Sequence, residues 1–331
     1  MKKAYYHVVK ESVEYAKNEY GGSVSGFLNA ILRRFLNDAE LRDMPDPDKV
    51  RNSYPPWLYK RWTRQFDTEN TDKLCAELIR EPRFALRVNT ARISVEEARQ
   101  RLADEGIIAG CGNFAPSALT VDRLLPVMAT PVFREGLLTI QGEASQLAGI
   151  AVREAAGKMI LDACSGSGTK TRQIMELCPA SSVYSMDNDM KRLMLSALKT
   201  SVICGDSIRP PIRSNIFDTI LIDAPCSSLG IIRKHPEIKW RRTKGEILRF
   251  AELQLAMLNS LWGLLAKGGR VIYSVCTFEP EETLGVIHNL AKEKKFTLEN
   301  PLPFLFNKEY FISLPHETAM DGFFIARLRK L

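Results

Sequence analysis

The sequence has no Cys-x-x-Cys pair and no two histidines at zinc-ligand spacing, although it contains seven cysteines. The common zinc sites need such spacings, so we expect no bound metal. The sequence also lacks any apolar run approaching the roughly 20 residues that span a bilayer, and its N-terminus lacks the apolar stretch of a signal peptide. We therefore expect a cytoplasmic protein that has no membrane partner and keeps its cysteines reduced.

Two common nucleotide-binding patterns are missing from the glycine-rich segment 165–171. The phosphate-loop pattern GxxxxGK[ST] fails because Thr169 separates Gly168 from Lys170, and the dinucleotide pattern GxGxxG fails at Thr171. ATP and nicotinamide cofactors are therefore disfavoured.

Acidic residues are too few to balance the basic ones. The chain carries 46 lysines and arginines against 39 aspartates and glutamates, which gives a net charge of +7 at pH 7. Basic side chains that neutralise phosphates release condensed counterions, so this charge favours a nucleic acid as partner. Charge alone does not identify that partner, because many basic proteins bind nothing acidic.

The length of 331 residues predicts more than one domain. Residues 1–42 are expected to form two helices broken at Gly21-Gly22, and a proline-rich linker then leads into a small α+β module at 43–153. From 154 to 331 strands, glycine turns and helices alternate, which predicts an α/β, Rossmann-like domain with a doubly wound parallel sheet.

A cofactor loop is expected where the apolar run 159–164 meets a predicted helix. Small residues there let backbone amides approach a ligand at the helix N-terminus. Asp187 ends the next strand, where such folds bind ribose hydroxyls, and Asp206 follows the strand after that, bordering an adenine pocket. Asp223 is also expected to contact the cofactor. The loop residues expected to bind it are Ala163, Cys164, Ser165, Gly166, Ser167, Gly168, Thr169 and Lys170.

Two cysteines are expected at the edge of the sheet where ligands bind. The apolar strand 217–222 delivers Asp223 and Cys226, and the strand 269–275 ends at Cys276. A single cysteine is more often an inert buried residue than a nucleophile. Two thiols and a carboxylate at one edge favour a catalytic site.

The motifs DACSGSGTKT, DAPCSS, RKHPEIKW and YSVCTFEPEE resemble those of the Sun (Fmu, RsmB-like) family of RNA cytosine-C5 methyltransferases. The similarity spans nearly the whole chain. The segment GFLNAILRRF resembles the end of a NusB-like RNA-binding domain, which points to the bacterial small-subunit rRNA branch and makes 1–42 the remnant of such a domain. The resemblance implies a methyltransferase domain that uses S-adenosyl-L-methionine.

The resemblance also implies roles for the site residues. Cys276 would add to C6 of cytosine and thereby activate C5, while Asp223 would hydrogen-bond the ring at N3. Cys226 would take part in releasing the product, and Lys170 would orient Asp223 or the base. The target cytosine must be unpaired or flipped out of its stack.

A basic segment follows the catalytic loop and is predicted to contact RNA, with 16S rRNA expected as substrate and a monomer as the active form. A charge run is more often a solvated face, but nearness to Cys226 favours contact with the substrate. The substrate-binding candidates are Arg233, Lys234, His235, Lys239 and Trp240.

The chain departs from the family pattern at three places. The loop has serines where the family has a sequence closer to AAPGGKT, the QDxAS segment has Gly142 in place of its acid, and the spacing before Asp206 is short. Three alternatives stay open: a tRNA substrate, a non-catalytic assembly factor, and a DNA cytosine methyltransferase. In the last of these the thiol of the Pro-Cys motif would be the nucleophile.

Overall fold

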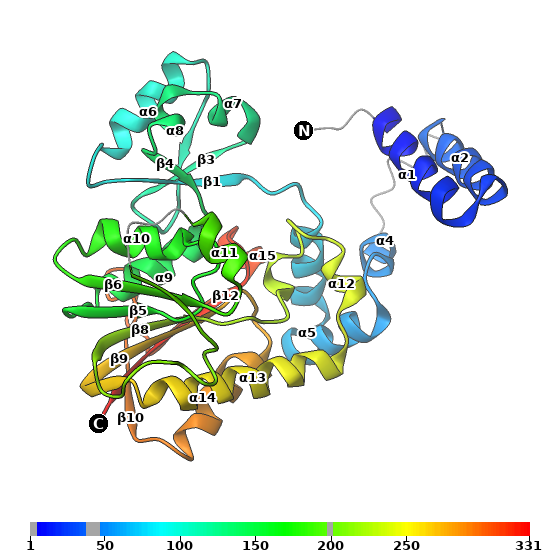
Figure 1. The fold of residues 1–331 in the computed structure, drawn as a ribbon. Helices are drawn as coiled ribbons and strands as arrows, with labels where there is room; N and C mark the ends of the chain where they lie inside the picture. Colours follow the sequence, from blue (N-terminus) through cyan, green and yellow to red (C-terminus); the bar gives the residue numbers. More distant parts are fainter. Residues whose placement is uncertain (1–4, 38–46, 197–200) are drawn as a thin grey trace. The chain divides into compact units, whose positions relative to one another are not determined.

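The computed structural model describes residues 5–37, 47–196 and 201–331, which form two compact units, Met1–Pro56 and Trp57–Leu331 (Figure 1). Each unit is described by itself. The domain boundaries expected at residues 42/43 and 153/154 stay predictions.

The first unit contains a pair of packed helices, α1 (Tyr5–Tyr20) and α2 (Gly22–Asn37), followed by α4 (Pro47–Asn52). Gly21 separates the pair with φ of 85°, a conformation that glycine adopts without steric penalty, and this confirms the expected helix break. Apolar side chains are exposed on both helices of the pair. The largest of them are Tyr6, Val8, Tyr15, Tyr20, Val24, Phe27, Ile31 and Phe35.

The second unit begins with α5 (Pro56–Leu78), which is kinked at Asp67. Asp67 has φ of 69°, and its carboxylate accepts the backbone N–H of Asn70 at 2.9 Å, so it caps the second half of the helix. Buried Leu58, Trp62 and Leu74 form the packed face of α5.

A small antiparallel sheet follows α5, with strand order β2-β3-β1-β4. Its core contains Leu86, Leu119 and Leu138 from the strands and Leu102 from a covering helix. The elements of this module are β1 (Phe84–Val88), α6 (Val95–Asp104), β2 (Gly110–Cys111), β3 (Ala118–Val121), α7 (Leu124–Met128), α8 (Pro131–Arg134) and β4 (Leu138–Ile140).

The large sheet of this unit has eight strands within the described residues, in the order β10-β12-β9-β8-β5-β6-β7, with β11 beside β12. The strands β5 to β9 run parallel, and the chain leaves β5 toward β6 on one side and returns as β8 on the other. The strands are β5 (Met159–Asp162), β6 (Ser182–Asp187), β7 (Ser201–Cys204), β8 (Phe217–Asp223), β9 (Leu265–Val275), β10 (Phe296–Glu299), β11 (Tyr310–Ser313) and β12 (Phe323–Lys330).

The large sheet is mixed, which differs from the expected parallel sheet. Strand β12 runs antiparallel between β9 and β10, and both β10 and β11 pair with its outer edge. The chain segment between β9 and β10, which contains α14, places β10 two strand positions away from β9. The C-terminal strand β12 occupies the position between them. The strand-turn-helix pattern could not predict this insertion, because it depends on a pairing between distant segments.

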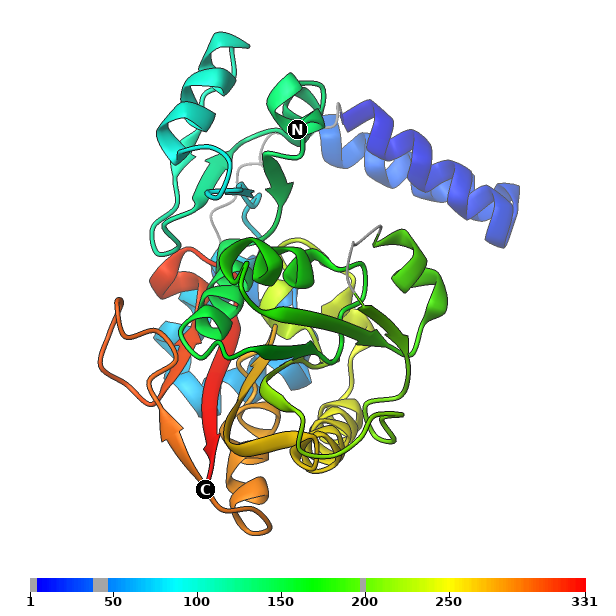
Figure 2. The same cartoon turned by 60° about the vertical axis from the view of Figure 1, so that its left-hand side comes forward.

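Helices cover both faces of the large sheet (Figures 1 and 2). On one face α9 and α10 pack over Ile160, Leu221 and Ile272, while on the other α13 and α14 pack over the alternating neighbours Leu161 and Ile220. The helices of this region are α9 (Glu143–Arg153), α10 (Thr169–Leu177), α11 (Met190–Leu195), η1 (Leu229–Ile231), α12 (Ile238–Arg241), α13 (Lys244–Trp262), η2 (Pro280–Glu282), α14 (Leu284–Ala291) and α15 (Pro315–Thr318).

Candidate active site

A cavity of about 640 Å³ opens at the carboxyl ends of β5, β6, β7, β8 and β9. It includes the point between β5 and β8 where the strand order reverses, and ligands bind at such points in open α/β sheets. The expected cofactor residues Ala163, Cys164, Ser165, Gly166, Ser167, Thr169, Lys170, Asp187, Asp206 and Asp223 all line this cavity. Gly168 is the exception: it caps α10 with φ of 78°.

The glycine turn is held against the end of β6. Asp187 accepts the backbone N–H of Gly166 at 2.8 Å and that of Asp189 at 2.9 Å. Gly166 has φ of 53°, and a Cβ built on it would have no neighbour within 4 Å, so its backbone faces open space. The hydroxyl of Ser165 is buried and has no hydrogen-bond partner among the described residues. This turn can therefore bind a polar ligand.

Two further carboxylates lie at the ends of β5 and β7. Asp206 is exposed at its rim and accepts the backbone N–H of Ile208 at 2.9 Å. Asp162 is fully buried at the end of β5 and accepts the hydroxyl of Thr171 at 2.7 Å. Burial raises the pKa of Asp162 to about 6. Asp162 thus ties β5 to α10, and Asp206 stays accessible to a ligand.

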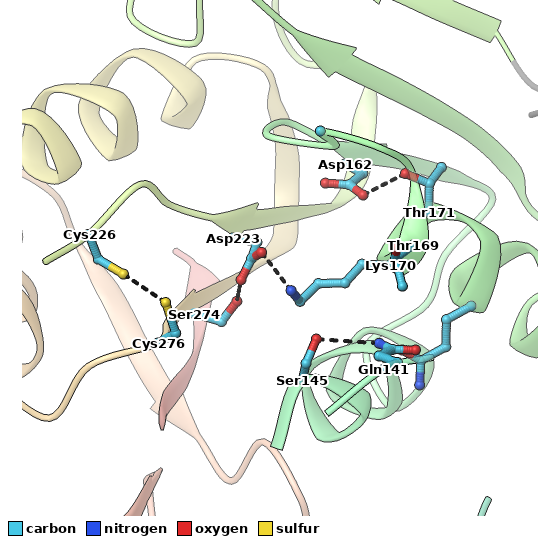
Figure 3. Close-up of polar contacts among 12 residues, drawn as sticks. Gln141, Ser145, Asp162, Thr169, Lys170, Thr171, Asp223, Cys226, Ser274 and Cys276 are labelled. Atoms are coloured by element: carbon cyan, nitrogen blue, oxygen red, sulfur yellow. Dashed lines mark hydrogen bonds and ion pairs between the residues drawn. The ribbon is translucent and has the colours of Figure 1, made fainter. Parts of the chain in front are cut away.

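Asp223 lies at the centre of the cavity, held from two sides (Figure 3). Lys170 Nζ lies 2.6 Å from one carboxylate oxygen, and the hydroxyl of Ser274 donates to the other at 3.0 Å. Burial is the largest single effect and acts to lower the pKa of Lys170, but the charge and hydrogen bond of Asp223, together with the charge of Asp162, raise that pKa on balance. Lys170 is therefore a cation, and it fixes the direction in which Asp223 points.

The two cysteines meet across adjacent strands. Cys226 Sγ lies 3.2 Å from Cys276 Sγ (Figure 3). Ser228 Oγ lies 3.5 Å from Cys276 Sγ. The hydrogen bond to Cys226 lowers the pKa of Cys276 against the opposing effect of burial, and the same bond raises the pKa of Cys226. The distance by itself lets either thiol donate, and it is the opposite pKa shifts that favour a thiolate at Cys276 with a neutral thiol at Cys226.

A buried polar group lies behind the cysteine pair. Glu282 accepts the backbone N–H of Ser227 at 2.8 Å and the side-chain amide of Gln254 at 3.1 Å. The hydroxyl of Tyr273 lies 2.6 Å from the carbonyl oxygen of Glu282. These contacts hold the loop that carries Cys226 against the segment that follows Cys276.

Several residues of the site were missed in the sequence. Gln141 accepts from Arg87 at 2.7 Å and donates to Gln173 at 2.8 Å and to Ser145 at 3.4 Å, which joins the small sheet to α9 and α10. Ser274, which holds Asp223, precedes Cys276 by two residues in the sequence. Strand alternation could have found Ser274, whereas the contacts of Gln141 depend on the packing of distant segments.

The five predicted substrate-binding residues do not line the catalytic cavity in the described structure. Arg233 and Lys234 bind Asp321 at 2.9 and 2.5 Å, and Lys239 is 7% exposed. His235 and Trp240 are exposed to solvent. Arg233 and Lys234 therefore hold the C-terminal segment, and the contact of all five with RNA stays a prediction.

The described part of the chain contains no group of three or more His, Cys, Asp or Glu side chains that could hold a metal ion. None of its helices is long and apolar enough to cross a membrane.

The chain is similar to known methyltransferases over nearly its whole length. A family model described as 16S rRNA methyltransferase RsmB/F matches residues 150–329, and one for the ferredoxin-like domain of the RsmF/B-like methyltransferases matches residues 54–128. The ribosomal RNA small subunit methyltransferase B of Vibrio cholerae is 34% identical over 97% of this chain and 76% of its own length. The protein of the same name from Pasteurella multocida is 33% identical over 92% of this chain and 72% of its own.

A solved structure has the same fold. The crystal structure of a methyltransferase homologue from Pyrococcus horikoshii superposes with a TM-score of 0.69 and 25% identity. The match covers 87% of this chain and all of that one.

Proposed function

Because the chain belongs to the 16S rRNA methyltransferase RsmB/F family, we propose that it methylates C5 of a cytosine in RNA, with small-subunit ribosomal RNA as substrate and S-adenosyl-L-methionine as methyl donor. One observation carries this proposal. The thiols of Cys226 and Cys276 lie 3.2 Å apart in the cavity that also contains the glycine turn and Asp223.

The glycine turn fits the methyl donor. Its open backbone at Gly166 and the unpartnered hydroxyl of Ser165 are suited to the polar groups of an amino-acid ligand, and Asp187 and Asp206 are suited to hydroxyl and amino groups. When bound, S-adenosyl-L-methionine supplies an electrophilic methyl group. The serines that replace the usual loop residues leave this cradle open.

Cys276 is the nucleophile in this proposal. Its thiolate adds to C6 of cytosine, the C5–C6 double bond opens, and C5 becomes an enamine carbon that can attack a methyl group. The thiolate is favoured because the contact with Cys226 lowers the pKa of Cys276. The reverse assignment, with Cys226 as nucleophile, would require the thiol with the raised pKa to ionise first.

Asp223 and Lys170 stabilise the charge that addition creates. N3 of the ring takes up a proton as negative charge develops there. Lys170 supplies this proton through Asp223, which then accepts the hydrogen bond of the N3–H group, and the proton returns to the pair when the bond from Cys276 to C6 breaks. Ser274 keeps the second carboxylate oxygen of Asp223 occupied, so the carboxylate cannot rotate away.

Cys226 completes the reaction. After methyl transfer, C5 carries both a proton and the new methyl group, and the proton must leave before the bond from Cys276 to C6 can break. Once Cys276 is covalently bound, Cys226 first loses its thiol proton to solvent water in the open cavity. The resulting Cys226 thiolate, which lies beside Cys276, takes the C5 proton as the bond from Cys276 to C6 breaks.

The test is methylation of purified substrates. The protein is incubated with S-adenosyl-L-methionine and either small-subunit rRNA or tRNA from a strain that lacks its gene, and bisulfite sequencing locates 5-methylcytosine. We expect one new site in the rRNA with wild type and none with Cys276→Ala. Methylation of tRNA alone would overturn the rRNA assignment. RNA binding without methylation of either substrate would instead support an assembly factor.

A further inference from the structure

A second concavity lies apart from the catalytic cavity and shares no lining residue with it. Its volume is about 490 Å³. It is lined by residues of α5, of η2 and of the first turn of α13. We call it the α5 basic pocket, and its lining residues are Trp57, Lys60, Arg61, Arg64, Gln65, Lys244, Pro280 and Glu281.

The lining of the α5 basic pocket is strongly cationic, with four basic side chains against the carboxylate of Glu281. Arg61 binds Glu281, so that carboxylate is already engaged. Lys60, Arg64 and Lys244 are exposed, and within the described residues they have no hydrogen bond or ion pair. Three unpaired cations around one concavity repel each other, and a bound polyanion would relieve that repulsion.

We propose that the α5 basic pocket binds backbone phosphates of the RNA strand that carries the target cytosine. Cationic side chains grouped around a concave surface attract the negative charges of a phosphodiester chain. Trp57, half-buried in the lining, offers an indole on which a base can stack. This proposal rests on the proposed function and extends it to the docking of the substrate.

The floor of the pocket is the segment that follows the nucleophile. Arg61 bonds both Glu279 and Glu281, and the indole N–H of Trp62 donates to Glu279 at 2.7 Å. Gln65 donates to the carbonyl of Phe278 at 3.3 Å. Phe278 and Glu279 follow Cys276 by two and three residues. RNA in the pocket would therefore be fixed relative to the nucleophile through direct contacts.

The charge of its lining distinguishes the α5 basic pocket from an ordinary solvated face. Solvated charge runs usually mix both signs, whereas here the one acidic group of the lining is neutralised by Arg61. Arg233 and Lys234, which the sequence favoured for this role, are occupied by Asp321. The α5 basic pocket offers free cations instead.

The test compares two double variants with the same change of charge. Lys60→Glu/Lys244→Glu alters the pocket, and Lys267→Glu/Lys308→Glu alters two exposed lysines that do not line it. Binding of a fluorescein-labelled single-stranded RNA oligonucleotide is measured by anisotropy at several salt concentrations. The full chain is used, and titration with S-adenosyl-L-methionine checks that the cofactor site is intact.

We expect the pocket variant to raise the Kd for RNA by about tenfold or more, and the control by less than about threefold. The slope of log K against the logarithm of the salt concentration should become less negative by about 1.4, because two phosphate contacts are lost. An equal rise in Kd for both double variants would contradict RNA binding by the α5 basic pocket and leave the proposed function intact. A wild-type protein that binds RNA tightly but methylates none would refute only the proposed function.

Discussion

Glu282 accepts the backbone N–H of Ser227 at 2.8 Å, directly beside Cys226. Burial raises the pKa of Glu282 to about 7, from an ordinary value of 4.5. The folded protein therefore binds this proton more tightly than the unfolded chain does. The resulting stability is fully present below about pH 4.5 and is lost as the pH rises through about 7.

Glu282→Gln should remove this pH dependence, because glutamine keeps the neutral form at every pH. As the pH rises from 4.5 to above 7, the wild type should lose up to about 3 kcal/mol of its free energy of unfolding, and the variant should not. The stability of the variant relative to the wild type should therefore increase by that amount. Urea unfolding at both ends of this window measures the gain. Exposed Glu293→Gln is the matched control, and a gain equal to that of the control would show that Glu282 has an ordinary pKa.

The cysteine pair predicts two opposite phenotypes. Cys276→Ala should abolish both methylation and the covalent RNA adduct, because the nucleophile is gone. Cys226→Ala should let the adduct accumulate, because the C5 proton can no longer leave. Denaturing gels with labelled RNA separate the two outcomes, with Cys111→Ala, in the small sheet, as control. Adduct formation by the Cys276→Ala protein would assign the nucleophile to Cys226.

Lys170→Met should lower kcat by about 100-fold to 1000-fold, because Asp223 loses the cation that orients it and supplies charge at the ring. The apolar stem of methionine fills much of the same space, so the fold should persist. Single-turnover methylation measures the loss, and exposed Lys158→Met is the control. A rate within about threefold of wild type would remove Lys170 from the chemistry.

Gly230→Ala should destabilise the protein by about 1 to 3 kcal/mol or more. A Cβ at residue 230 would lie 2.0 Å from the carbonyl oxygen of Gly322, a backbone atom that cannot move aside alone. The same residue donates its N–H to the carbonyl of Cys276, so adduct formation should slow as well. Gly245→Ala, where the added methyl meets nothing within 4 Å, is the control and should be neutral or stabilising. Unchanged urea unfolding of the Gly230→Ala protein would contradict the close packing.

Much of the candidate site could be placed from the sequence because parallel strands deliver their carboxyl ends to one edge of the sheet. Cys226 and Cys276 each follow an apolar strand, and Lys170 opens the helix after the glycine turn, so local patterns were enough to bring them together. The helix break at Gly21-Gly22 could likewise be predicted from the sequence, because a helix tends to end at two consecutive glycines.

Only the tertiary structure decided which distant groups pair. The insertion of β12 between β9 and β10 and the binding of Arg233 and Lys234 to Asp321 join segments far apart in the chain. So does the contact of Arg61 with Glu279. Residue type limits which pairs are chemically possible, but it does not choose among them. The choice is made by packing, because a buried charge or an open sheet edge is stable only when the folded chain supplies its partner.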